Sequence, residues 1–139
     1  MDMETPDLPS RSPTNDDLVA LARELNRLGA KYIVIGGFAV GRLGDDRATK
    51  DIDFLISSDM ANQGRVRQAL EILPDKAIKD LGPDEDMAEV VVVRAFDGVT
   101  VDMMTKACGV AYDEAEKDIE FVEIRGVRIP FANMDLMPN

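Results

Sequence analysis

Apolar positions in the first third of the chain follow the spacing of a helix. Four leucines recur at intervals of three and four residues: Leu18, Leu21, Leu25 and Leu28. This period predicts an amphipathic helix with one buried face. Thr14 followed by Asp17 is a capping pattern, and Gly29 is a typical stop signal. We therefore expect a helix that begins after Thr14 and ends at Gly29.

Short apolar runs predict strands along the rest of the chain. The expected strands are 31–36 (KYIVIG), 51–57 (DIDFLIS), 88–96 (AEVVVVRAF), 99–105 (VTVDMMT), 119–124 (IEFVEI) and 127–131 (VRIPF). The other expected helices are 37–44, 60–73 and a short helix or turn at 111–117. The pairs Asp97-Gly98 and Arg125-Gly126 predict hairpins. This alternation indicates an α/β or α+β fold, a small mixed sheet with helices packed on it.

Length and composition place the chain among globular proteins with one domain. We expect residues 1–13, which are acidic and rich in Pro and Ser, to form a disordered tail before a domain at 14–139. The formal net charge of −11 disfavours non-specific binding to nucleic acid, because phosphate contacts need cations. No apolar run reaches the roughly 18 residues of a membrane helix. The single Cys108 excludes an intramolecular disulfide and fits a reducing, cytoplasmic location.

Two glycines interrupt the chain where the first predicted strand meets a short helix. Gly36 and Gly37 lack side chains, so the backbone there can approach a ligand closely. The first N–H groups of a helix have no partners within the helix and attract anions. A tight turn without a ligand explains the pair equally well.

Two aspartates open the second predicted strand. Asp51 and Asp53 are two residues apart, so both side chains point to the same face of that strand, whereas Ile52 and Phe54 point to the other. Carboxylates this close repel each other unless a cation lies between them, and Mg²⁺ prefers oxygen ligands. A solvated strand end is the alternative for an isolated Asp-x-Asp.

The combination of these features resembles a known family. A strand leads into Gly-Gly, a short helix, a polar loop and Asp-Ile-Asp, with thirteen residues between Gly37 and Asp51. This arrangement resembles the polymerase-β-like nucleotidyltransferase superfamily. The stretch RATKDID at 47–53 resembles the AbiEii-like and related small bacterial nucleotidyltransferases, some of which are toxins of toxin–antitoxin systems. The likeness extends more loosely over 14–137.

The resemblance implies a catalytic site with three carboxylates. Asp102, which interrupts the apolar run VTVDMMT, is the matching third acid beside Asp51 and Asp53. All three would bind Mg²⁺ or Mn²⁺, and Asp102 is the candidate to accept the proton of the attacking hydroxyl. The implied nucleotide-binding residues are Gly36, Gly37, Arg47, Thr49 and Lys50. Arg47 and Lys50 fit phosphate neutralisation and a solvated surface equally well.

The resemblance also implies the partners. The donor would be an NTP, and the acceptor an RNA, a protein or a small molecule with a hydroxyl group. Many relatives continue beyond GVRIPFANMDLM into a helical segment that would help to grip nucleotide or acceptor, and apolar surface uncovered without it favours a homodimer. Two alternatives from other classes are a non-catalytic binding or antitoxin-like module and an acidic mimic of nucleic acid.

Overall fold

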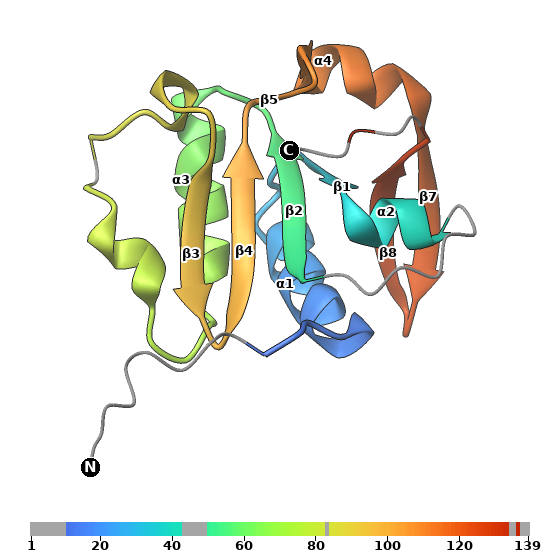
Figure 1. Cartoon of the computed structure of the whole chain (residues 1–139), viewed down its shortest axis with the longest axis horizontal. Coiled ribbons are helices and arrows are strands. Elements are labelled where there is room, and N and C mark those ends of the chain that lie inside the picture. Colours follow the sequence, from blue (N-terminus) through green and yellow to red (C-terminus); the bar gives the residue numbers. More distant parts are fainter. Residues whose placement is uncertain (1–10, 43–49, 83, 134–135, 137–139) are drawn as a thin grey trace.

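A mixed β-sheet forms the centre of the computed structural model, which describes residues 11–42, 50–82, 84–133 and 136. Among these residues, six strands form one sheet in the order β3-β4-β2-β1-β8-β7 (Figure 1). The strands are β1 (Tyr32–Ile35), β2 (Asp51–Ile56), β3 (Val93–Asp97), β4 (Val99–Met104), β7 (Ile119–Ile124) and β8 (Val127–Ala132). The helices are α1 (Asn15–Arg27), α2 (Gly37–Arg42), α3 (Met60–Leu70) and α4 (Tyr112–Ala115). The 3₁₀ turns are η2 (Ala77–Asp80), η3 (Met87–Glu89) and η4 (Glu116–Asp118), and a small separate ribbon contains β5 (Lys106–Ala107) and β6 (Val110–Ala111).

The central strands combine parallel and antiparallel pairing. β2 runs parallel to β4 and antiparallel to β1, while β1 runs parallel to β8. The hairpins β3–β4 and β7–β8 complete the two edges of the sheet. The prediction of a small mixed sheet with packed helices is confirmed. The β5–β6 ribbon was not predicted.

Apolar side chains pack on both faces of the central strands. On one face, α1 and α3 pack against alternate strand residues such as Ile52, Phe54 and Val101. A smaller apolar cluster lies on the other face, where Leu55 and Met104 contact residues of α4 and its neighbours. The smaller cluster covers only part of this face, and the charged residues of β2 and β4 lie on the same face beside it.

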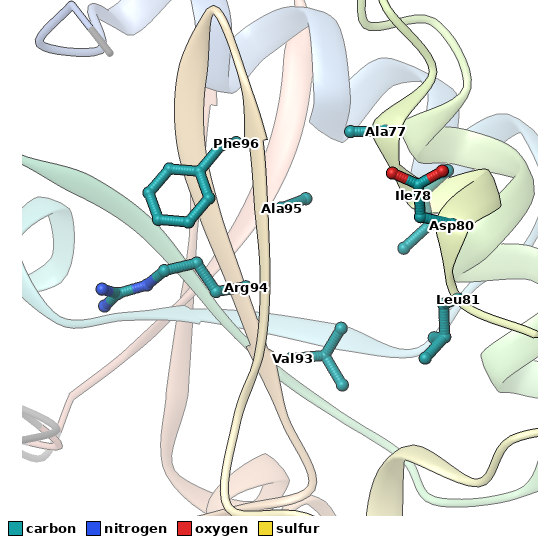
Figure 2. Close-up of a pocket in the computed structure, with 8 residues that line it drawn as sticks. All are labelled: Ala77, Ile78, Asp80, Leu81, Val93, Arg94, Ala95 and Phe96. Carbon is teal, nitrogen blue, oxygen red and sulfur yellow. The ribbon is translucent and has the colours of Figure 1, made fainter. Parts of the chain in front are cut away.

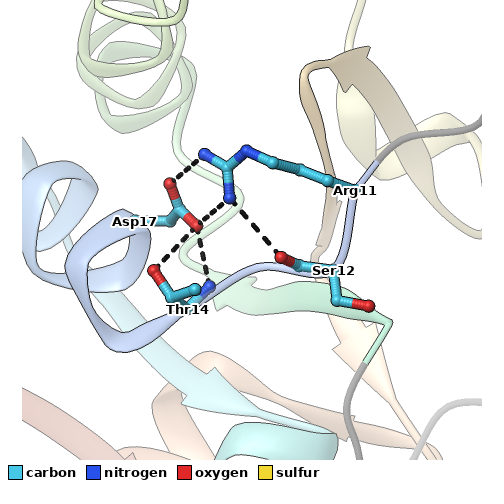
Figure 3. A network of polar contacts seen from close by, with 4 residues as sticks. All are labelled: Arg11, Ser12, Thr14 and Asp17. Atoms are coloured by element: carbon cyan, nitrogen blue, oxygen red, sulfur yellow. Dashed lines mark hydrogen bonds and ion pairs between the residues drawn. The ribbon is translucent and has the colours of Figure 1, made fainter.

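The start of α1 follows the predicted capping pattern (Figure 3). The backbone N–H of Thr14 donates to Oδ2 of Asp17 at 2.7 Å, and the Arg11 guanidinium donates to both oxygens of the same carboxylate. These hydrogen bonds lower the pKa of Asp17 to about 2, and the bond from Arg11 makes the largest contribution. Of the tail expected at 1–13, the structure describes residues 11–13. Pro13 is buried, and the N–H of Arg11 donates to the carbonyl of Gly98.

Two predicted elements are shorter in the structure. α3 ends at Leu70 rather than at residue 73. β3 begins at Val93 rather than at residue 88, and the side chain of Val91 is 87% exposed. Val93 pairs with Met103 and β4 ends one residue later, so residues before Val92 have no strand to pair with. β-propensity alone cannot replace that missing partner.

Other predicted elements agree with the structure where it describes them. The short helix expected at 37–44 is α2, which ends at Arg42, and the loop expected at 44–50 lies mostly outside the described residues. Both predicted hairpins are present. The second turns at Arg125-Gly126 as predicted, whereas in the first Asp97 belongs to β3 and pairs with Val99 across Gly98. In the part of the chain described here, no helix has the length and apolar character needed to cross a membrane.

Candidate active site

Three aspartates from two neighbouring strands meet on one face of the sheet. The parallel register of β2 and β4 places Asp53 opposite Asp102, and Asp51 opposite Thr100. One carboxylate oxygen from each of Asp51, Asp53 and Asp102 lies within 4.8 Å of the other two. The structure thus brings together the three carboxylates that the sequence singles out.

The neighbouring residues of each strand fix the direction of these side chains. Ile52 and Phe54 on β2, and Val101 and Met103 on β4, lie in the main core against α1 and α3. Successive side chains of a strand point to opposite faces, so the intervening aspartates must point away from that core. Their surroundings are enclosed even so: Asp53 is 6% exposed and Asp102 4% exposed, while Asp51 is half-buried.

Gly36 lies directly against one of these carboxylates. Its φ is +74°, a conformation that glycine adopts without strain. A β-carbon at this position would lie 2.1 Å from Oδ2 of Asp53. The sequence suggested that this glycine leaves space for a ligand, but in the structure the space beside it holds the carboxylate of Asp53. Gly37 begins α2 immediately afterwards.

Burial and crowding change the acidity of Asp53. Removal from water disfavours the charged carboxylate and raises the pKa of Asp53 to about 7, with further contributions from the charges of Asp102 and Asp51 and from a hydrogen bond to Asp102. Positive charge from Arg94 opposes the shift. Near neutral pH, Asp53 therefore carries a proton for a substantial fraction of the time.

Arg94 is a site residue that the sequence analysis missed. It pairs with Asp102 across β3 and β4, where Nε donates to Oδ1 and Nη2 donates to Oδ2, each at 2.8 Å. Nη2 also lies 3.6 Å from Oδ2 of Asp51. A two-residue loop at Asp97-Gly98 would have placed Arg94 opposite Val101, whereas in the structure Asp97 pairs with Val99 and Arg94 with Asp102, so the turn residues alone did not reveal this contact.

The side chains of β3 divide between the site and a separate hollow (Figure 2). Arg94 and Phe96 extend from one side of the strand, whereas Val93 and Ala95 point toward η2. A hollow of about 360 Å³ lies between β3 and η2. Because side chains alternate along a strand, Arg94 and Phe96 share the face of the carboxylates, and the enclosed acids lie on the opposite side of β3 from η2.

The donor set fits a hard divalent cation. Mg²⁺ holds oxygen ligands at about 2.0–2.1 Å, so ligands on opposite sides of one ion are roughly 4.2 Å apart. One oxygen from each of the three carboxylates lies within 4.8 Å of the other two, a separation compatible with a shared ion. Such an ion would also favour the ionised form of Asp53.

The expected nucleotide-binding residues are only partly described. Gly36 lies against the carboxylate of Asp53, Gly37 follows it as the first residue of α2, and Lys50 is exposed immediately before Asp51. Arg47 and Thr49 lie outside the described residues.

Comparison with solved structures supports the fold. The chain resembles the crystal structure of a "putative nucleotidyltransferase" from Thermotoga maritima with a TM-score of 0.63 and 15% sequence identity, over 94% of this chain and 84% of that one. No known family profile matches the sequence, and no curated protein matches it. At this level of identity the likeness establishes a shared fold.

Proposed function

We propose that this protein is a metal-dependent nucleotidyltransferase that moves a nucleoside monophosphate from an NTP to a hydroxyl group. The observation that carries the proposal is the meeting of Asp51, Asp53 and Asp102 on adjacent parallel strands, within one cation's reach. The fold shared with a protein named as a nucleotidyltransferase supports it. A scaffold without a ligand gains nothing from three crowded carboxylates, one of which has a pKa raised first by burial and then by the charges of its two neighbours.

The three aspartates have distinct surroundings and therefore distinct proposed roles. Asp53 and Asp102 are enclosed and fixed by strand pairing, so they provide the rigid part of a Mg²⁺ or Mn²⁺ site. Asp51 is half-buried at the start of β2 and lies toward solvent, where the nucleotide would enter. When bound, the ion would polarise a phosphoryl oxygen and balance charge on the phosphates.

We assign the phosphates to the turn beside Asp53. Gly36 and Gly37 lead from β1 into α2, and the carboxylate of Asp53 packs against Gly36. Backbone N–H groups in this turn would then face phosphates already oriented by the metal site. Lys50, Arg47 and Thr49 are proposed to bind phosphate or neutralise its charge. The basis is the resemblance of residues 47–53 to the AbiEii-like enzymes.

The acceptor and the biological role are proposed more broadly. An RNA, a protein or a small molecule with a free hydroxyl group would each satisfy the chemistry. A toxin–antitoxin role in the cytoplasm rests on the resemblance of residues 47–53 to the AbiEii-like enzymes, and a homodimer is a further proposal.

Labelling experiments test the activity directly. The purified protein is incubated with Mn²⁺ or Mg²⁺, a bacterial lysate and each of the four α-³²P-labelled NTPs, and the labelled product is separated by size. We expect label transfer with at least one NTP, and loss of transfer in Asp53→Asn. Asp97→Asn is a matched control, because Asp97 is a buried acid that binds backbone N–H groups away from the cluster. Absence of label with every NTP contradicts the proposal. Where label is found, digestion of the product with nuclease or protease shows whether the acceptor is RNA or protein.

One observation favours a second candidate, a non-catalytic binding module with this fold. The Arg94 guanidinium already holds both oxygens of Asp102, and a permanent internal counterion would make a metal unnecessary. In that case neither Mn²⁺ nor Mg²⁺, with or without NTP, would raise the melting temperature. A ligand that binds only the folded state must raise it, so a thermal shift separates the two candidates.

A further inference from the structure

The contact between Arg94 and the carboxylates is asymmetric. The side chain of Arg94 is 48% exposed, whereas that of Asp102 is 5% exposed. Arg94 belongs to the edge strand β3, and Asp102 to the inner strand β4. The guanidinium can therefore turn into solvent without disturbing the core, while the carboxylate is held in place.

A bound cation and Arg94 would use the same oxygens. Both oxygens of Asp102 accept hydrogen bonds from Arg94, and Nη2 of Arg94 lies 3.6 Å from Asp51. An ion held by the three aspartates must take one oxygen from Asp102 and one from Asp51. Two positive groups at these oxygens repel each other strongly in an enclosed site.

We propose that Arg94 is a displaceable counterion, a positioning residue that holds Asp102 and Asp51 in their binding arrangement and turns away from Asp102 when a divalent cation binds. This inference rests on the proposed metal site. It explains how carboxylates that repel one another keep their geometry without a metal. After the exchange, the guanidinium lies at the rim of the site, where it can meet an anionic ligand.

Metal binding to Arg94 variants tests the inference. Mn²⁺ affinity is measured from the electron paramagnetic resonance signal of free Mn²⁺ for the parent, Arg94→Ala and Arg94→Gln. We expect both variants to bind Mn²⁺ on the order of tenfold more tightly than the parent, the size of a typical coupling between two ligands of one site. Arg94→Lys keeps the charge but cannot form the two-pronged contact, so its affinity should lie between those of the parent and Arg94→Ala.

Two controls isolate the exchange from general charge effects. Arg65→Ala removes the same charge from the exposed surface of α3, which packs on the other face of the sheet, and should leave Mn²⁺ affinity nearly unchanged. In the Asp102→Asn background, Arg94→Ala should no longer increase affinity, because the shared carboxylate is gone.

Thermal unfolding provides a second readout. In EDTA, Arg94→Ala should melt below the parent, because the carboxylates lose their counterion. With saturating Mn²⁺ this deficit should disappear. Displacement of Arg94 can also be followed by NMR. The Nε–H of Arg94 donates to Asp102, so its signal should lose its protection from hydrogen exchange with water when diamagnetic Mg²⁺ is added.

The outcomes separate this inference from the proposed function. If the parent binds Mn²⁺ and Arg94→Ala binds it equally or more weakly, the metal site stands and the exchange is wrong. If only the Arg94 variants bind Mn²⁺, the metal site is present but Mn²⁺ does not displace Arg94, and the proposed displacement is wrong. If neither binds Mn²⁺, both the exchange and the metal site are refuted.

Discussion

A β-carbon on Gly36 would lie 2.1 Å from Oδ2 of Asp53, so the missing side chain at Gly36 makes room for the carboxylate. The two residues are joined through the antiparallel pairing of β1 and β2, which sets Ile35 opposite Asp53. The glycine turn and the acidic strand, seventeen positions apart from Gly36 to Asp53, are thus parts of one site.

Gly36→Ala should therefore disturb the site as well as the fold. The positive φ alone costs about 1–2 kcal/mol for alanine, and the close contact must push Asp53 aside. We expect a loss of more than about 2 kcal/mol in the free energy of unfolding, measured by urea denaturation, and weaker Mn²⁺ binding.

Gly126→Ala is the matched control for backbone strain. Gly126 has φ +79° with no atom within 4 Å of an added β-carbon. This variant should lose about 1 kcal/mol and bind Mn²⁺ like the parent. Equal effects of the two substitutions on Mn²⁺ binding would show that the contact between Gly36 and Asp53 is unimportant.

Asp53 should make the metal-free protein less stable as the pH rises. Burial raises its pKa from 3.8 to about 7 in the folded state. Between these values the folded state binds more protons than the unfolded state, so the free energy of unfolding falls with pH through this window and reaches its lower level above about pH 7. Urea denaturation in EDTA from pH 5 to pH 8 measures the slope. Asp53→Asn should flatten it, and an unchanged slope would assign the dependence to other groups.

Asp53→Asn and Asp102→Asn should change the free energy of unfolding of the metal-free protein in opposite directions. Without metal, Asp53→Asn removes a crowded carboxylate and should stabilise the protein at pH 8. Asp102→Asn removes the ion-pair partner of Arg94 and should destabilise it by about 1 kcal/mol. Both should abolish nucleotidyl transfer. Stabilisation by Asp102→Asn would mean that repulsion among the acids outweighs the contact with Arg94.

Asp97 should behave as a structural acid. Its carboxylate is buried and accepts the backbone N–H groups of Asp75 and Ala77 at 2.7 and 2.9 Å. Asp97→Ala leaves two part-buried donors without this partner, so the free energy of unfolding should fall by about 1–2 kcal/mol. Mn²⁺ affinity of the folded variant should not change. Weaker Mn²⁺ binding would extend the metal site beyond the three aspartates.

Patterns within a few residues of each other were readable from the sequence. Alternation along β2 decides that Asp51 and Asp53 share a face, because side chains of a strand point to opposite sides in turn. The capping pair Thr14 and Asp17 is likewise local, since both residues lie in one helical turn. The presence of a hairpin at Gly98 was also local, although its register, with Asp97 opposite Val99, was not.

Tertiary structure decided which of these local patterns meet. The parallel pairing of β2 with β4, which sets Asp53 beside Asp102, joins strands separated by a helix, two 3₁₀ turns and the strand β3. Strand propensity over 88–96 did not reveal that β3 starts at Val93, because that boundary depends on where β4 ends.

The roles of Gly36 and Arg94 also became visible only in three dimensions. Gly36 leaves room for an oxygen of Asp53, and Arg94 donates hydrogen bonds to both oxygens of Asp102. Conformational preference and periodicity act over one helical turn or a few strand residues, so they can be predicted from the sequence. Contacts between strands are chosen by the packing of the whole sheet, in which both faces must be covered at once, and this choice placed three repelling carboxylates and one arginine together.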